Sequence, residues 1–316
     1  MAVETTTFSN NSADTWFRDI MFDCVLCPRA CHVNRLAGQT GYCGQTAELM
    51  AARASLHYWE EPCISGTSGS GTVFFSGCNL RCVFCQNHNI ALGKAGRVIA
   101  PEHLAEIFLQ LQEQGANNIN LVTPTHFLPQ IVIALEQAKQ QGLHLPIVYN
   151  TGSYESPEAL RHLEGLVDIY LPDLKYFSPE LSTAYSHAPD YFETACAAIS
   201  EMYRQVGDSV IDEDTGLMQH GMIVRHLLLP GQTKDSKKIL RYLHETYGDH
   251  IYISIMNQYT PLPQVADIEV LNRTVTPEEY DRVLRFAERI GIERGFRQEG
   301  TAASESFIPE FDERRL

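Results

Sequence analysis

The alternation of short apolar runs with amphipathic stretches, from residue 72 to residue 290, limits the fold more than any other feature of the sequence. Six runs have the composition of buried strands, at residues 72–76, 118–122, 145–150, 167–171, 222–229 and 251–255. Stretches with apolar residues at helical spacing lie between and after them, at residues 101–115, 127–142, 156–163, 191–206, 236–247 and 277–290. Repeated strand–helix units predict an α/β fold built on a parallel sheet.

The number of units narrows the choice of architecture. Right-handed strand–helix–strand connections lead either to a doubly wound sheet or to a barrel. Six units are fewer than the eight of a full barrel, so we expect a partial (β/α)6 TIM-like barrel, although periodicity alone leaves the doubly wound sheet open. In both architectures functional side chains gather at the C-terminal ends of the strands.

The composition of the 316-residue chain changes along its length and indicates four segments. We predict a polar arm over residues 1–20, a small cysteine-rich metal-binding lobe over 21–65, the partial barrel over 66–297 and an acidic tail over 298–316. Segment 208–221 is polar and is interpreted as a hairpin or a loop insertion.

Composition excludes several classes of protein. The 24 basic and 39 acidic residues give a formal net charge of −15, which argues against binding to nucleic acid. The sequence shows neither the features of a signal peptide nor an apolar run of about 18 residues, so we expect a cytoplasmic protein with no membrane segment. Nine cysteines in so long a chain then indicate metal or redox chemistry rather than a disulfide framework.

Three of these cysteines form a compact set directly after the first predicted strand. Cys78, Cys82 and Cys85 can bind three irons of a 4Fe-4S cluster, and the local sequence supplies no fourth thiolate. One iron would then stay open to a substrate or cofactor. A structural zinc loop is the alternative, but zinc prefers four ligands and fits this spacing poorly.

Four further cysteines, Cys24, Cys27, Cys31 and Cys43, form a second set within the predicted lobe. Four thiolates complete either a closed iron–sulfur cluster or a tetrahedral zinc site, and the spacing leaves both open. A cluster would serve as an electron relay or a substrate anchor, whereas zinc would stabilise a lobe that has little core of its own.

Polar residues follow several of the predicted strands. They are Thr123, Thr125 and His126 after the second strand, Asn150 and Thr151 after the third, Asp173 and Lys175 after the fourth, and His226 on the fifth. These residues can also have purely structural roles. Asp173 and Lys175 can form an ordinary ion pair, and His226 can be a core residue. His126 can simply follow Thr125, which would then be the N-cap of a helix. Because Arg225 and His226 alternate on a strand, at most one of them needs to face the site.

The Cys78, Cys82 and Cys85 spacing, with Phe84 before the last cysteine and a strand before the first, resembles the radical S-adenosylmethionine (SAM) superfamily. This resemblance implies a 4Fe-4S cluster whose open iron binds the amino and carboxylate groups of SAM. It also implies that one electron cleaves the sulfonium, and that the resulting 5′-deoxyadenosyl radical abstracts a hydrogen atom from the substrate.

Further segments, at residues 60–62, 69–75, 85–87, 122–126 and 224–231, resemble the branch named after pyruvate formate-lyase activating enzymes, and in particular a sub-branch with an N-terminal cysteine set. By that resemblance the SAM contacts are Asn150, Thr151, Asp173, Lys175 and His226. The Gly-Gly-Glu sequence of the activating enzymes, which contacts the SAM amino group, is absent here. The resemblance leaves Thr123, Thr125 or His126 as the substitute contact.

The resemblance implies a function and two partners. We expect activation of a glycyl radical enzyme as protein substrate, with a flavodoxin- or ferredoxin-type reductant. A radical SAM enzyme acting on a small metabolite, peptide or RNA is the first alternative, favoured by the absent Gly-Gly-Glu and the extra cysteine set. An iron–sulfur electron carrier without SAM chemistry is the second, although a carrier does not need a six-unit barrel.

Overall fold

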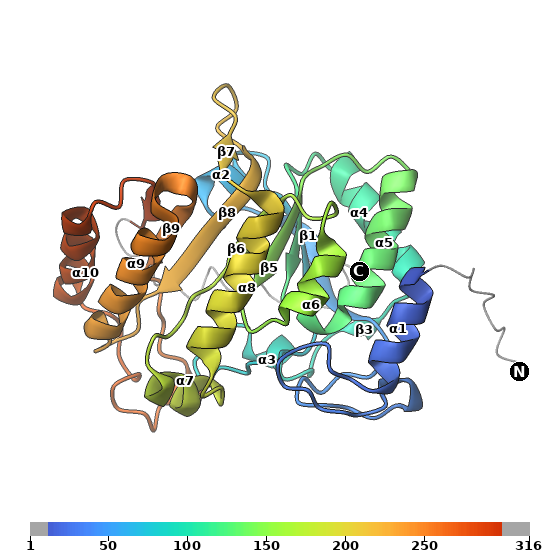
Figure 1. Cartoon of the computed structure of the whole chain (residues 1–316), viewed down its shortest axis with the longest axis horizontal. Coiled ribbons are helices and arrows are strands. Elements are labelled where there is room, and N and C mark those ends of the chain that lie inside the picture. The colour runs from blue at the N-terminus through green and yellow to red at the C-terminus, as the bar shows by residue number, and fades with distance from the viewer. Residues whose placement is uncertain (1–11, 299–316) are drawn as a thin grey trace, which may run out of the picture.

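The computed structural model describes residues 12–298. The strands are β1 (Met50–His57), β2 (Ser70–Phe75), β3 (Arg97–Val98), β4 (Ile119–Val122), β5 (Ile147–Thr151), β6 (Ile169–Pro172), β7 (Val210–Ile211), β8 (Met218–Leu227), β9 (Tyr252–Met256) and β10 (Gly295–Arg297). The helices are α1 (Ser12–Phe22), α2 (Pro62–Ser65), α3 (His88–Ala91), α4 (Pro101–Glu113), α5 (Leu128–Gln140), α6 (Pro157–Leu160), α7 (Pro179–Ser186), α8 (Tyr191–Val206), α9 (Thr233–Tyr247) and α10 (Pro277–Ile290). Figure 1 shows their arrangement.

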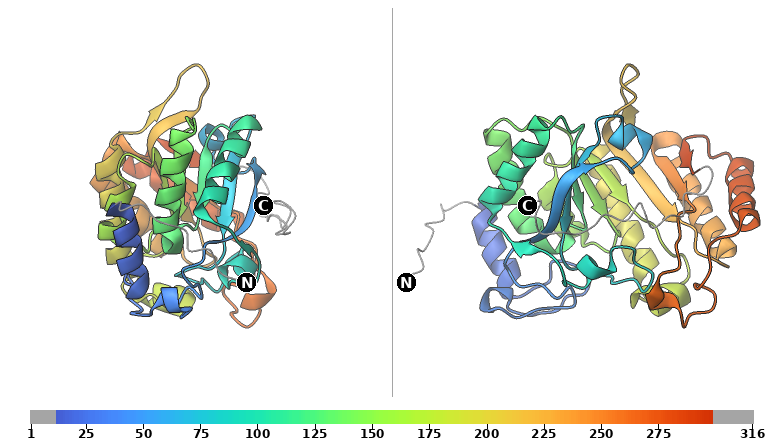
Figure 2. Two further views of the ribbon diagram at one scale, coloured as in Figure 1. Left: turned by 90° about the vertical axis from the view of Figure 1, so that its right-hand side faces the viewer. Right: turned by 180° about the vertical axis from the view of Figure 1, so that it is seen from behind.

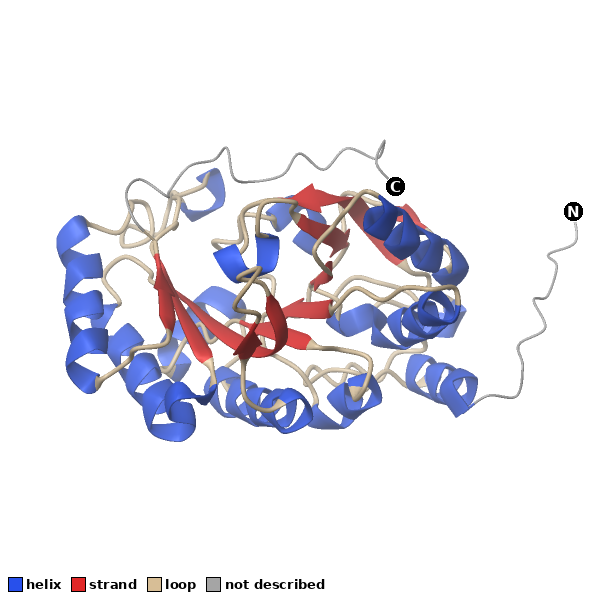
Figure 3. Ribbon diagram, turned by 90° about the horizontal axis from the view of Figure 1, so that it is seen from above, coloured by secondary structure: helices blue, strands red, loops and turns tan. Residues whose placement is uncertain are grey.

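The order of the strands identifies the architecture as a partial barrel. The sheet runs β10-β9-β8-β6-β5-β4-β2-β1-β3, and every pair from β10 to β2 is parallel. The parallel strands β2, β4, β5, β6, β8, β9 and β10 lie side by side in chain order. This part of the sheet therefore winds in one direction and lacks the reversal of a doubly wound sheet. The long helices lie on one side of this curved sheet (Figure 3), and the view from behind shows the opposite side (Figure 2).

Local sequence signals explain where the covering helices start and stop. Helix α10 begins with a capping box, in which the Thr276 side chain accepts from the backbone of Glu279 and the Glu279 side chain accepts from the backbone of Thr276. It ends at Gly291, whose φ of 92° is left-handed. Helix α4 begins at Pro101 and buries a stripe at helical spacing, formed by Leu104, Ile107, Phe108 and Leu111.

The six predicted strands and the six predicted helical stretches are confirmed as β2, β4, β5, β6, β8 and β9 with the helices between and after them. Segment 208–221 forms a hairpin, because β7 pairs antiparallel with β8. Strands β1, β3 and β10 were not predicted from the sequence. Among residues 12–298, no helix is both long and apolar enough to cross a membrane.

Two predicted boundaries need correction. Residues 12–20 do not belong to the predicted polar arm, because they are part of helix α1, whose Trp16 ring stacks on His162 with ring centroids 3.7 Å apart. The predicted lobe of residues 21–65 is also too long, since β1 pairs antiparallel with β2 and is part of the main sheet. The predicted tail lies outside the described residues, apart from Gln298.

Candidate active site at the strand ends

A cavity of about 260 Å³ opens at the C-terminal ends of the parallel strands. Most of the predicted site residues line it, namely Cys78, Cys82, Cys85, Thr123, Thr125, Asn150, Thr151, Asp173 and Lys175. They come from the loop after β2 and from the ends of β4, β5 and β6, which confirms that the fold brings these distant segments together.

The loop with the three cysteines leaves β2 through Gly77, whose φ is 91°. A Cβ there would lie 2.9 Å from the backbone oxygen of Cys43, so the tight approach of the N-terminal lobe requires glycine. Ser186 contacts the Cys82 sulfur at 2.9 Å, and desolvation raises the pKa of Cys85 to about 12. Binding of iron would therefore have to displace protons from buried thiols.

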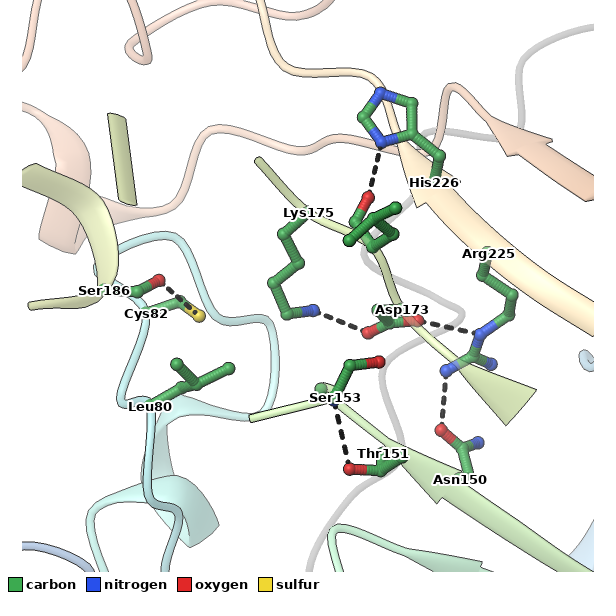
Figure 4. A network of polar contacts seen from close by, with 12 residues as sticks. Leu80, Cys82, Asn150, Thr151, Ser153, Asp173, Lys175, Ser186, Arg225 and His226 are labelled. Carbon is green, nitrogen blue, oxygen red and sulfur yellow. Dashed lines mark hydrogen bonds and ion pairs between the residues drawn. The ribbon is translucent and has the colours of Figure 1, made fainter. Parts of the chain in front are cut away.

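A buried ion network borders the cavity on the side of β6 and β8 (Figure 4). Lys175 Nζ lies 2.5 Å from Asp173 Oδ2, and Arg225 Nε lies 2.9 Å from Asp173 Oδ1. The other two guanidinium nitrogens donate to Glu60 at 3.0 Å and to the side-chain oxygen of Asn150 at 2.6 Å. Burial by itself would raise the pKa of Asp173, but Arg225 and Lys175 outweigh burial and hold that pKa below its usual value.

Two of the predicted cofactor contacts, His126 and His226, do not line the cavity. Strand β8 turns Arg225 towards the cavity, and the His226 ring donates from Nδ1 to the Leu174 carbonyl at 2.8 Å (Figure 4). The His126 ring donates from Nε2 to the Ser76 carbonyl at 2.6 Å. Desolvation lowers the pKa of His226 to about 4 and that of His126 to about 3, so both rings are neutral.

A fully buried carboxyl group, Glu155, lies behind the threonines of the cavity wall. Its Oε1 accepts from the hydroxyls of Thr125 at 2.6 Å and Thr151 at 2.5 Å. Thr125 therefore does not cap a helix. Desolvation raises the pKa of Glu155 to about 7, and the hydroxyl contacts only partly oppose that shift. Thr123, at φ 57°, holds a left-handed conformation that costs a β-branched residue about 1–3 kcal/mol.

The raised pKa of Glu155 predicts how stability depends on pH. The pKa is raised on folding, so its contribution to stability is fully present below about pH 4.5 and is lost as pH rises through about 7. Glutamine carries no charge at any of these pH values, whereas the buried glutamate ionises as pH rises. The unfolding free energy of Glu155→Gln minus that of the wild type should therefore increase by about 2–3 kcal/mol between pH 5 and pH 8. Urea titrations at both pH values measure it, with Glu113→Gln on the exposed end of α4 as the control. An advantage that is equal at both pH values would contradict the prediction.

The N-terminal cysteine set lies directly against the Cys78–Cys85 loop. The Cys27 sulfur contacts the Asn79 side chain, and Cys43 lies close enough to Cys24, Cys27 and Cys31 to be influenced by their charge. Within residues 12–298, no three Cys, His, Asp or Glu side chains converge tightly enough to hold a single metal ion. A four-iron cluster does not require that convergence, since each thiolate binds a different iron.

Arg29 ties the N-terminal lobe to the cavity loops. Its guanidinium donates to the backbone oxygens of Asn79 at 2.8 Å, Ser186 at 3.0 Å and His187 at 2.5 Å. The same group lies over the Tyr42 ring, 4.0 Å from its centroid. One side chain thus fixes the lobe, the cysteine loop and the end of α7 in a single arrangement.

The geometry of the cysteine loop agrees with a comparison to known protein families. The family model described as "Radical SAM superfamily" matches residues 72–243, which is more than half of the chain. The chain belongs to the radical SAM superfamily. Membership implies a 4Fe-4S cluster and SAM. Three thiols bordering one cavity, with polar side chains opposite them, are a donor set that fits both groups.

Three known proteins are similar to parts of this radical SAM protein. An uncharacterised protein of Methanocaldococcus jannaschii is 27% identical over 286 residues, covering 87% of this chain and 77% of that protein. A pyruvate formate-lyase-activating enzyme of Clostridium pasteurianum is 29% identical over 121 residues, covering 36% of this chain and 48% of that enzyme. A solved domain of a pyruvate-formate lyase-activating enzyme from Bacteroides vulgatus gives a TM-score of 0.42 at 14% identity, covering 58% of this chain and 100% of that domain.

Sequence reasoning missed three polar residues at or behind the cavity of this radical SAM protein. Glu60 belongs to a segment that carries the resemblance, but only the fold brings it to Arg225. The alternation of Arg225 with His226 predicted that at most one of them needs to face the cavity, and the local sequence did not show which one. No sequence pattern marked Glu155, because its role depends on hydrogen bonds from threonines at the ends of two different strands.

Proposed function

We propose that this radical SAM enzyme activates a glycyl radical enzyme by abstracting a hydrogen atom from a glycine of that protein. The observation that carries the proposal is the set of three cysteine thiols that share one cavity with the polar ends of β4, β5 and β6. The similarity to the Clostridium pasteurianum activating enzyme supports the choice of a protein substrate.

The residues of the cavity divide into binding and shielding groups. Cys78, Cys82 and Cys85 would hold the cluster, which together with bound SAM supplies a 5′-deoxyadenosyl radical when one electron is delivered. Asn150 and the neighbouring threonines would orient SAM through hydrogen bonds. Phe84 packs edge-on against Tyr176, Tyr185 and Tyr259, and this aromatic wall would keep water away from the cysteine loop.

The test is an anaerobic reaction of the reconstituted protein with SAM, a flavodoxin- or ferredoxin-type reductant and a glycyl radical enzyme encoded beside it. We expect 5′-deoxyadenosine in proportion to a glycine-centred radical detected by electron paramagnetic resonance. If SAM is cleaved and no partner acquires that signal, the glycyl-radical proposal is wrong and only the superfamily chemistry stands.

A second candidate, a radical SAM enzyme for a small metabolite or peptide, is favoured by the lack of Gly-Gly-Glu at the end of β4, where residues 122–126 stand instead. A low-molecular-weight fraction of cell extract should then stimulate 5′-deoxyadenosine formation. The active component would resist protease if it is a metabolite and would be a short chain if it is a peptide. Stimulation only by an intact protein partner would decide against this candidate.

For the N-terminal set we propose a second iron–sulfur cluster, supported by the contact between Cys27 and the loop of the first cluster. We predict that a Cys24→Ala, Cys27→Ala variant loses about four irons per chain and no zinc. Iron, sulfide and zinc are counted together after anaerobic reconstitution, with Cys63→Ser as the control. A loss of about one zinc at unchanged iron would show a structural zinc site instead.

A further inference from the structure

The carboxyl group of Glu155 connects two strand ends that are far apart in sequence. Thr125 follows β4 and Thr151 ends β5, and both hydroxyls donate to the same oxygen, Oε1 of Glu155. Tyr149 OH lies 3.5 Å from that oxygen, and Oε2 has no hydrogen-bond partner among the described residues. The carboxyl is fully buried and does not line the cavity, so it acts on the cavity only through the threonines.

The direction of these hydrogen bonds determines what the threonines present to a ligand. A hydroxyl group has one proton, and Thr125 and Thr151 both give it to Glu155. Only lone pairs of the two oxygens then remain for the cavity, which both residues line. The Ser153 N–H uses one lone pair of Thr151, at 3.2 Å. The wall formed by these threonines therefore accepts hydrogen bonds and cannot donate them.

The backbone around this wall is held in an uncommon conformation. Thr123, two residues before Thr125, has φ 57°, and Ser153, between Thr151 and Glu155, has φ 64°. The Thr123 N–H donates to the Asn150 carbonyl at 2.9 Å, which fixes the two loops to each other. Figure 4 shows Ser153 and Thr151 at the end of β5, beside the Asp173 and Arg225 network.

We propose that Glu155 is a positioning residue that holds Thr125 and Thr151 as paired hydrogen-bond acceptors for the amino group of SAM. The amino group is the donor to expect there, because Thr125 follows β4, where the Gly-Gly-Glu contact of the activating enzymes is absent. This inference rests on the proposed function, since SAM is the ligand. It assigns the missing contact to two neutral side chains that are oriented from behind by one buried carboxyl.

The test is a double-mutant cycle in which one change is made in the protein and the other in the ligand. The altered ligand is a SAM analogue in which hydrogen replaces the amino group. Affinities of SAM and of the analogue are measured by equilibrium binding to the cluster-loaded protein. In the wild type, loss of the amino group would remove both its expected bond to the cluster and its proposed hydrogen bonds to the threonines. In Glu155→Leu the hydroxyls lose their acceptor, so we expect the affinity ratio of SAM to analogue to fall about tenfold.

A matched variant separates orientation from simple structural support. The carbonyl oxygen of Glu155→Gln still accepts from both threonines, so we expect that variant to keep the wild-type ratio. A merely structural role would weaken both ligands equally and leave the ratio unchanged in Glu155→Leu, which would overturn the inference. A ratio that falls equally in both variants would overturn it as well. If the wild type binds no SAM, the proposed function itself fails, and that result is distinct from an unchanged ratio.

Discussion

Replacement of Cys78, Cys82 or Cys85 by alanine is expected to remove one four-iron cluster and to reduce SAM cleavage below detection. The three thiols line the cavity, and no other cysteine lines it among the described residues. With only two local thiolates left, a cubane cluster loses a ligand that the loop cannot replace. Anaerobic reconstitution, iron and sulfide analysis and detection of 5′-deoxyadenosine by chromatography measure the effect.

The control for this experiment is Cys196→Ala. Cys196 lies on α8, where its thiol contacts Tyr242, and it does not line the cavity. This variant should keep the wild-type iron content and the wild-type yield of 5′-deoxyadenosine. Persistent SAM cleavage by the Cys78, Cys82 and Cys85 variants would refute the assignment of these residues to the catalytic cluster.

Replacement of Arg225 by methionine is expected to destabilise the protein by about 3 kcal/mol, because it leaves Glu60 and Asp173 buried without their shared cation. Because Lys175 still pairs with Asp173, we expect a destabilisation at the lower end of the range found when buried ion pairs are broken. The melting temperature should fall by roughly 6–12 °C for a chain of this size. The loss should shrink in acid, because the pKa of Asp173 is depressed and its stabilising contribution disappears as pH falls through that pKa.

Arg297→Met is the matched control, since it removes an arginine from an exposed ion pair with Glu288. Both of those side chains are more than half exposed, so that pair contributes at most about 1 kcal/mol. Thermal unfolding by circular dichroism compares the two variants at pH 7 and at about pH 3, below the ordinary aspartate pKa of 3.8. Equal melting temperatures would show that the cavity network does not stabilise the fold.

Sequence periodicity predicted the central parallel strands but not the edges of the sheet. The six central strands are apolar runs of at least four residues bounded by turn residues, so the local sequence is enough to identify them. Strand β1 is a mixed run with a register shift between Ala51 and Arg53, and it is a strand because β2 and β3 pair with it. β3 and β10 have two and three residues, too few to show any period.

The same distinction explains the candidate site. The cysteine loop was predictable because all three donors lie within eight residues, and parallel strands brought Asn150, Asp173 and Lys175 to it. The two histidines do not line the cavity, because sequence does not determine which way a strand-end side chain turns. The Glu155 contacts depend on two loops with left-handed residues, Thr123 and Ser153, and neither of these residues is of a type that predicts such a conformation.

The short outer strands of the sheet have a consequence for association between copies of the protein. An incomplete barrel has two open edges, and an open edge is a template on which a second chain can add a strand. Within residues 12–298 the edges are β3 and β10, which have only two and three residues, and each carries an arginine, Arg97 or Arg297. Edge-to-edge growth would gain few backbone hydrogen bonds, so the barrel can stay open without becoming prone to aggregation along its sheet.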